Sequence, residues 1–209
     1  MVLGGGPDAE IAVQVTASRN EEAGRCLRWA IQATQSLAYL SDLHASLPST
    51  RQLPGGHDLL AVHVAHARWA ATTATTAVDL CSAVLGLLYL PTRRSGRYYD
   101  FRELSAKVRD THVHCGAREW LGEAVESDDF RVVDGLRDPL AHRTLGRHYA
   151  VKFTARSPIP SATDHLVQTS FEVDGNDAPI AADQVVLTAE RCARHIVGSF
   201  LARAASGRI

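Results

Sequence analysis

The residues best suited to chemistry lie in one short stretch, 136–143, which reads Leu-Arg-Asp-Pro-Leu-Ala-His-Arg. Histidine titrates near neutral pH, so His142 is suited to taking a proton from a ribose 2′-hydroxyl or giving one to a leaving oxygen. The planar fork of Arg137 can hold a phosphate through two hydrogen bonds and stabilise the charge that develops on it. On a regular helix Asp138 lies four residues before His142, where its carboxylate would orient the imidazole. We therefore predict Arg137, Asp138 and His142 as catalytic residues.

This order of residues, an arginine, a polar residue, three further residues and a histidine, resembles the motif of the HEPN superfamily. Proteins of that superfamily are all-helical and usually dimeric, and many are metal-independent RNases of toxin and antiviral systems. The resemblance implies a homodimer with a composite site, RNA as substrate, no cofactor, and an antitoxin or another protein as a further partner. It covers six residues directly and, through the helical layout, extends loosely over 18–145. One departure is Asp138, which stands where the family more often has asparagine.

Two other interpretations stay open. In the first, Arg137, Asp138 and His142 form a structural ion-pair network, and the protein is a non-catalytic bundle that binds a nucleotide or a protein. In the second, the protein is a metal-dependent bundle enzyme similar to the DinB-like families, because His63 and His66 have a spacing at which two imidazoles can bind one ion. The other histidines considered for such a site are His57, His112, His114, His142 and His148. Since no carboxylate-histidine motif accompanies them, we assign no metal ligand from the sequence.

A basic segment with interleaved aromatic residues precedes the motif at 93–99. Arginine contacts phosphates and tyrosine stacks on unpaired bases, so this composition is suited to single-stranded RNA if the loop folds beside Arg137 and His142. Two further arginines follow the motif. The predicted substrate-binding residues are Arg93, Arg94, Arg97, Tyr98, Tyr99, Arg143 and Arg147.

Helical periodicity and capping signals predict the elements that position these residues. Helices are expected over about 18–47, 58–90, 100–112, 117–125, 127–140 and 182–205. The helix at 58–90 contains a run of alanine and threonine, 70–77, which is typical of a central helix that others approach closely. Alternation of Ile11, Val13 and Val15 predicts a short strand in the N-terminal lead, 1–17. Gly135 and Pro139 predict a kink or break in the motif helix.

A change of period from 3.6 to 2 at 149–156 and again at 166–173 predicts two strands, which form a loose hairpin within 149–177. The predicted fold class is therefore mainly α, a HEPN-like up-and-down helical bundle in one domain, 1–209. A small antiparallel β-hairpin is inserted before the last helix.

Composition bounds the function further. The net charge is −1, with 22 basic and 23 acidic side chains, so no overall basic field is present and nucleic acid would need a local patch. The four cysteines are far apart, which favours unpaired thiols and a reducing compartment. No signal peptide is read, and the most apolar run, 83–90, is too short to cross a bilayer. These features predict a cytoplasmic protein without a membrane anchor.

Overall fold

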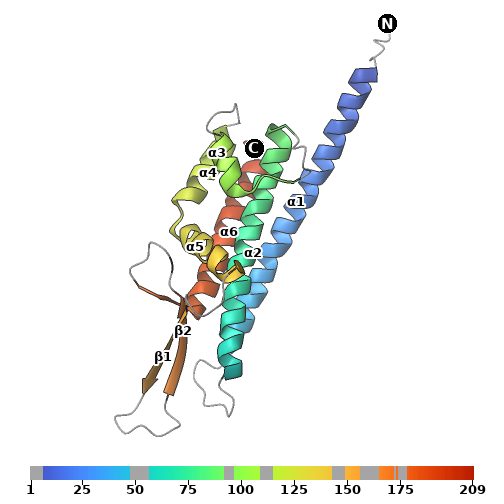
Figure 1. Cartoon of the computed structure of the whole chain (residues 1–209). Coiled ribbons are helices and arrows are strands. Elements are labelled where there is room, and N and C mark those ends of the chain that lie inside the picture. Colours follow the sequence, from blue (N-terminus) through green and yellow to red (C-terminus); the bar gives the residue numbers. More distant parts are fainter. Residues whose placement is uncertain are drawn as a thin grey trace.

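A computed structural model of the protein describes residues 7–47, 57–91, 97–108, 115–142, 149–155, 165–171, 173 and 178–209. The elements within these residues are drawn in Figure 1. The helices are α1 (Pro7–Ala45), α2 (His57–Tyr89), α3 (Phe101–Val108), α4 (Cys115–Glu126), α5 (Asp128–His142) and α6 (Ala182–Ala205). The strands are β1 (Tyr149–Ala155), β2 (His165–Phe171) and β3 (Ile180–Ala181). The predicted mainly α bundle with a small antiparallel hairpin before the last helix is confirmed.

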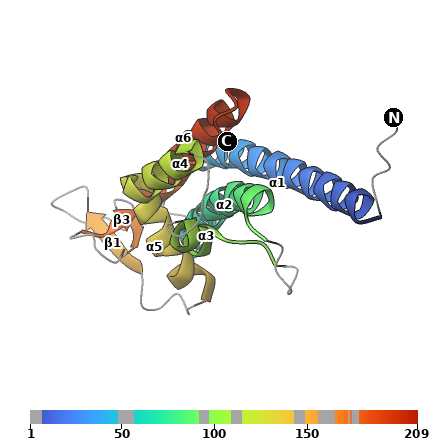
Figure 2. The same ribbon diagram turned by 90° about the horizontal axis from the view of Figure 1, so that it is seen from above.

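Helix α2 is the central helix of the bundle and packs against α1, α3, α5 and α6 (Figure 2). Its small side chains make this possible, since Ala70, Ala71, Ala74 and Ala77 are fully buried and let neighbouring backbones approach closely. The segment 61–89 is long and apolar enough to cross a membrane by length and composition. However, 61% of its most apolar window is buried inside the protein, so the bundle core accounts for its hydropathy.

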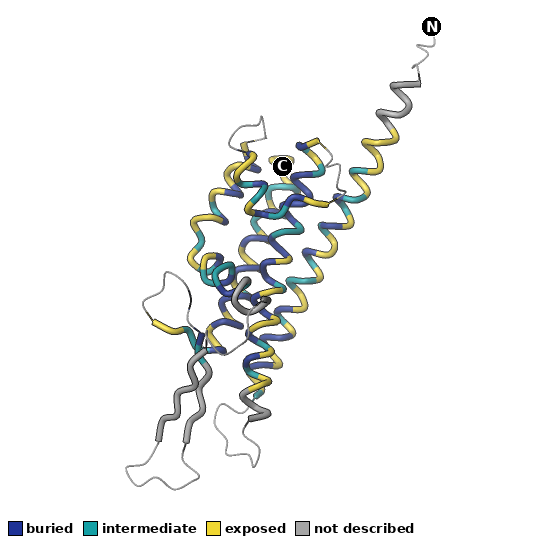
Figure 3. The backbone as a smooth tube through the Cα atoms, viewed as in Figure 1, coloured by how far each residue is buried: buried dark blue, intermediate teal, exposed yellow. Residues whose placement is uncertain are grey.

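The helices around α2 are joined by aromatic packing. The ring of Phe101 on α3 meets those of Trp120 on α4 and Phe130 on α5 edge to face, with centroids 6.1 and 4.8 Å away. Trp120 also packs on Phe200 of α6 and donates its indole N–H to the carbonyl of Ile196 at 2.9 Å. Such aromatic contacts bury large areas and fix the short helices α3 and α4 on the long ones. Figure 3 shows the buried residues along the faces where the helices meet.

Local capping sets the starts of α3 and α5, as predicted. Asp100 accepts a hydrogen bond from the backbone N–H of Glu103 at 2.9 Å, and the Glu103 carboxylate accepts one from the N–H of Asp100 at 3.3 Å. This reciprocal pair is a capping box. The hydroxyl of Ser127 accepts from the N–H of Phe130 at 3.3 Å and begins α5. Helix α5, which carries the predicted motif, is therefore anchored at its N-terminus by its own sequence.

Two sequence predictions are wrong. The predicted strand around 11–15 is part of α1, which already begins at Pro7, and Ser18 lies inside this helix rather than at its start. The residues between the β-branched positions, such as Ala12 and Gln14, are good helix formers, and proline is favoured at a first helical position.

The predicted break in α5 is also absent, because the helix continues through Pro139 to His142. Because Pro139 lies near the C-terminus of α5, only the last turn loses a hydrogen bond.

The hairpin pairs β1 with β2 in antiparallel register, from Tyr149 opposite Phe171 to Ala155 opposite His165. The two-residue strand β3, which the sequence did not predict, adds to β2 opposite Ser170 and Phe171. Phe171 and Val173 are buried, and a Cβ atom at Gly135 would come within 3.1 Å of Val173. The base of the sheet therefore packs against α2 and α6, and Val173, just beyond β2, contacts the motif helix α5.

Candidate functional site

Arg137 is the one member of the predicted catalytic trio whose side chain the structure describes. It lies on α5, is 33% exposed, and places its Nη2 atom 3.3 Å from Oδ2 of Asp79 on α2. Asp138 and His142 belong to the backbone of α5, but their side chains lie outside the described residues, as do Arg143 and Arg147. On a continuous helix the five-residue step from Arg137 to His142 corresponds to a rotation of about 140° around the axis.

The Asp79 carboxylate joins α5 to the start of α3. Its Oδ2 faces Arg137, while Oδ1 accepts a hydrogen bond from the backbone N–H of Phe101 at 2.9 Å. Burial raises the pKa of Asp79, and the Phe101 N–H and the Arg137 guanidinium act in the opposite direction. Arg137 and the first turn of α3 are thus held on the same carboxylate.

The described end of the predicted RNA-binding loop, residues 97–99, leads through Asp100 into this first turn of α3. Arg97 is exposed and lies 3.5 Å from the carboxylate of Asp100. The hydroxyl of Tyr98 donates to Glu22 of α1, so the loop is tied to that helix as well. The predicted residues Arg93 and Arg94 lie outside the described part of the chain.

The position of Tyr99 differs from the prediction. Its side chain is only 7% exposed, and a Cβ atom at Gly86 would collide with its ring at 2.8 Å. The ring therefore fills a space on α2 that glycine leaves, and it cannot stack on a base. Within the predicted loop, the exposed aromatic residue is Tyr98.

Charges around Arg137 are balanced rather than basic. Arg102 on α3 donates from Nε and Nη2 to Oδ2 of Asp134, at 3.2 and 2.9 Å. Asp134 lies one turn before Arg137 on α5, so carboxylates alternate with guanidinium groups along this face. The sequence could not show these partners, because Asp79 and Asp134 come from separate elements and have no local motif.

A second polar cluster lies where α1, α2 and α6 pack together. It consists of His44 on α1, His63 and His66 on α2, and Asp183 in the first turn of α6. One ligand atom from each of His44, His63 and Asp183 lies within 4.8 Å of the other two. The sequence singled out the pair of α2 but missed His44 and Asp183. A signal existed for His44, which continues the buried stripe of Leu37 and Leu40 at helical spacing.

The imidazoles of this cluster are packed closely. His44 is 6% exposed, and its Nδ1 lies 3.2 Å from Nδ1 of His66. Its Nε2 lies 3.5 Å from Oδ1 of Asp183, and Nδ1 of His63 lies 4.0 Å from the same oxygen. Burial, and secondarily the neighbouring His63, lower the pKa of both His44 and His66. Both rings are therefore favoured in the neutral form, which binds metal ions.

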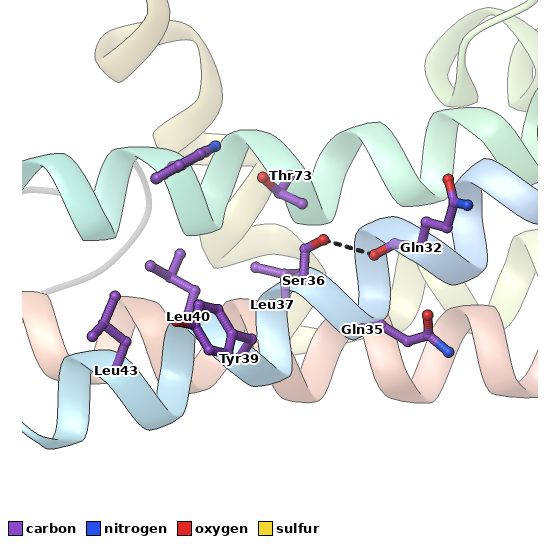
Figure 4. Close-up of a pocket in the computed structure, with 9 residues that line it drawn as sticks. Gln32, Gln35, Ser36, Leu37, Tyr39, Leu40, Leu43 and Thr73 are labelled. Carbon is purple, nitrogen blue, oxygen red and sulfur yellow. Dashed lines mark hydrogen bonds between the residues drawn. The ribbon is translucent and has the colours of Figure 1, made fainter.

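A groove lies between α1 and α2, apart from both polar clusters. It has a volume of about 720 Å³ and is shown in Figure 4. Its lining consists of Gln32, Gln35, Ser36, Leu37, Tyr39, Leu40, Leu43, Trp69 and Thr73. None of these side chains is a carboxylate, an imidazole or a strong base, so the groove has none of the usual metal ligands and no cation to hold a phosphate. We therefore place no chemistry there.

Comparisons with known protein families, with curated proteins and with solved structures find no match for this chain. The class of the protein is therefore defined by its own structure, which is a mainly α bundle with a small antiparallel hairpin before the last helix.

Proposed function

We propose that this chain is a HEPN-like cytoplasmic protein that acts as a homodimer and cleaves RNA without a metal ion. In this proposal Arg137 holds the scissile phosphate, His142 transfers protons, Asp138 orients His142, and the segment at 93–99 holds the RNA strand.

One observation carries the proposal. Asp79 binds both Arg137 and the N–H of Phe101, and this common contact joins the motif helix to the start of α3, which follows the basic segment in the chain. A phosphate held by Arg137 would then have Arg97 and Tyr98 within a few residues of the same anchor. Both side chains are exposed, as a surface that holds RNA requires.

The Arg137–Asp79 contact is compatible with phosphate binding because it is partly open to water. Ion pairs that solvent reaches contribute only about 0–1 kcal/mol, so a phosphate can compete for the guanidinium. Arginine also has five N–H donors, and one carboxylate oxygen at 3.3 Å occupies few of them.

The rotation between Arg137 and His142 supports a composite site. Because helix positions five residues apart face different directions, the proposal does not require one copy to direct both residues at the same phosphorus. Two copies facing each other would supply a pair of histidines to one phosphate. One histidine takes the proton of the 2′-hydroxyl, whose oxygen attacks phosphorus, and the other protonates the departing 5′ oxygen. The products are a 2′,3′-cyclic phosphate and a free 5′-hydroxyl.

The experiment is cleavage of labelled single-stranded RNA in excess EDTA by the wild type, Arg137→Ala and His142→Ala. We expect cleavage by the wild type and a loss of about 100-fold or more in each variant. Arg131→Ala is a matched control, since Arg131 is an exposed arginine of the same helix that pairs with Asp128. The proposal fails if the wild type leaves RNA intact, or if all four proteins cut it equally.

A non-catalytic HEPN-like bundle is the second candidate, and the Arg137–Asp79 pair favours it because the guanidinium already has an anionic partner. This candidate, a bundle that binds a nucleotide or a protein, predicts no cleavage by any variant and no change in RNA binding in Arg137→Ala, because the pair with Asp79 is then structural. Fluorescence anisotropy with labelled RNA, run on the same preparations, separates the two candidates.

A further inference from the structure

We propose that His44, His63 and Asp183 bind one divalent transition-metal ion of the zinc class, and that His66 positions His44 for this role. The site lies at the packing of α1, α2 and α6, apart from Arg137 on α5, and it does not rest on the proposed RNase activity. In Figure 1 these parts of the three helices meet at the lower end of the bundle.

The first argument is the spacing of the ligand atoms. Two ligands bound to zinc at about 2.0–2.1 Å in tetrahedral geometry lie about 3.3 Å from each other. Oδ1 of Asp183 lies 3.5 Å from Nε2 of His44 and 4.0 Å from Nδ1 of His63. These separations are longer than good hydrogen bonds and close to those of atoms that share an ion. Small rotamer adjustments would bring all three atoms to bonding distance.

The second argument is proton accounting at His44, a side chain that is more than nine-tenths buried. Its Nδ1 lies 3.2 Å from Nδ1 of His66, so one of these two atoms must donate and the other accept. If His44 donates, its Nε2 carries a lone pair that faces the carboxylate of Asp183. In that tautomer a cation between the two acceptors binds both of them. In the other tautomer, in which His66 donates, the N–H of His44 Nε2 faces the carboxylate instead, so metal binding selects the first tautomer.

The Nε2 atom of His44 is inaccessible to solvent and, at 3.5 Å from Oδ1 of Asp183, has no well-formed hydrogen bond among the described residues. Buried polar atoms are nearly always satisfied, so such an atom points to a missing ligand. The role of His66 follows from the same geometry. A histidine that binds a metal usually donates its other ring N–H to an acceptor, which fixes its tautomer and orientation.

The ligand set indicates the kind of site. Structural zinc sites are closed by four protein ligands, whereas catalytic sites keep an open position for water. Two imidazoles and one carboxylate leave such a position, and Asp183 is 58% exposed, so solvent reaches the ion. Imidazole with carboxylate suits zinc and other first-row ions, and disfavours magnesium and calcium, which prefer oxygen ligands alone.

The test is metal binding by the full chain after treatment with EDTA and desalting. Calorimetry with zinc, and visible absorption with cobalt as a substitute, report stoichiometry and coordination. We expect one tight site per chain in the wild type. Affinity should fall about 100-fold or more in His63→Ala and Asp183→Asn, and about 10–100-fold in His66→Ala, as is typical of residues that orient a ligand. His195→Ala is the control, because His195 lies exposed on α6 beside Glu123.

His44→Ala removes a buried side chain, so circular dichroism must first show that this variant folds. If His44→Ala does not fold, the variants at the partly exposed positions His63 and Asp183 still test the proposal. The proposal is overturned if the wild type binds no zinc at micromolar concentrations, or if His195→Ala weakens binding as much as His63→Ala. Arg137→Ala should bind zinc like the wild type, so the metal site and the RNase proposal can fail separately.

Discussion

The Arg137–Asp79 pair and the histidine cluster both lie between helices of one bundle. They differ in whether each polar atom has a suitable hydrogen-bonding or charged partner. At Asp79, a carboxylate meets a guanidinium and a backbone N–H, so donors face acceptors. At His44, a buried imidazole faces a second imidazole on one side and a carboxylate on the other. The residues of the first cluster satisfy one another, whereas the second leaves Nε2 of His44 without a well-formed hydrogen bond, and the proposed cation would bind there.

This difference shows which kind of buried polar group indicates a ligand. A satisfied pair is compatible with a structural role, and a function for Arg137 depends on a competitor that displaces Asp79. An atom such as Nε2 of His44, which is buried and unsatisfied, has a free-energy cost of about 1–3 kcal/mol that a ligand would relieve. We therefore expect the histidine cluster to respond to metal and the Arg137 pair to respond to pH and to substitution.

The largest effect should be stabilisation by zinc. A ligand at 100 times its dissociation constant adds about 2.7 kcal/mol to the free energy of unfolding, which corresponds to a rise in Tm of roughly 5–10 °C for a chain of this size. Differential scanning fluorimetry of the EDTA-treated protein with and without zinc measures it. Asp183→Asn should lose most of this rise, and Arg137→Ala should keep it. An equal rise in all three proteins would place the bound zinc elsewhere.

The next effect concerns Arg137→Ala. This change leaves the carboxylate of Asp79 without its cation, and we expect it to lower the free energy of unfolding by about 1–2 kcal/mol at pH 7.5. Burial already raises the pKa of Asp79 above the ordinary value of 3.8, and loss of Arg137 raises it further. As pH falls through this raised pKa, the carboxyl group takes up a proton and no longer needs a partner. The destabilisation should therefore shrink towards pH 4.

Urea unfolding of the wild type and Arg137→Ala at pH 4 and pH 7.5 measures this. Arg131→Ala, on the same helix, should change stability little at either pH because Arg131 and Asp128 are both exposed. If Arg137→Ala destabilises the protein equally at both pH values, loss of the pair with Asp79 is not the cause.

The sequence predicted most of the fold because the signals involved are local. The capping box at Asp100 and Glu103 and the cap at Ser127 each act within four residues, and the structure has both. The period of α6 and of the two strands is likewise a property of neighbouring residues. The N-terminal strand was wrong for a related reason, since three β-branched residues at alternate positions do not outweigh the helix formers between and after them.

The candidate sites were less predictable because their partners come from distant parts of the chain. The sequence identified Arg137 but not Asp79, which belongs to another helix, and it identified His63 and His66 but not Asp183. Tyr99 shows the same limit. Its place in an aromatic and basic segment predicted stacking on RNA, yet Gly86 leaves room on α2 for its ring, and it is buried.

The smallest effect should come from Asp79→Asn, which tests whether the ion pair with Asp79 competes with phosphate for Arg137. Asparagine keeps an oxygen for the N–H of Phe101 but removes the charge that competes with phosphate. If Arg137 holds RNA as proposed, the affinity for single-stranded RNA should rise by up to about fivefold, since a solvent-accessible ion pair contributes about 1 kcal/mol or less. Fluorescence anisotropy at constant salt measures this. Asp134→Asn is matched in charge and releases Arg102 instead, so an equal gain in both variants would reflect net charge alone. A gain specific to Asp79→Asn would assign phosphate binding to Arg137 and make the Arg137–Asp79 pair, like the histidine cluster, a site that awaits its ligand.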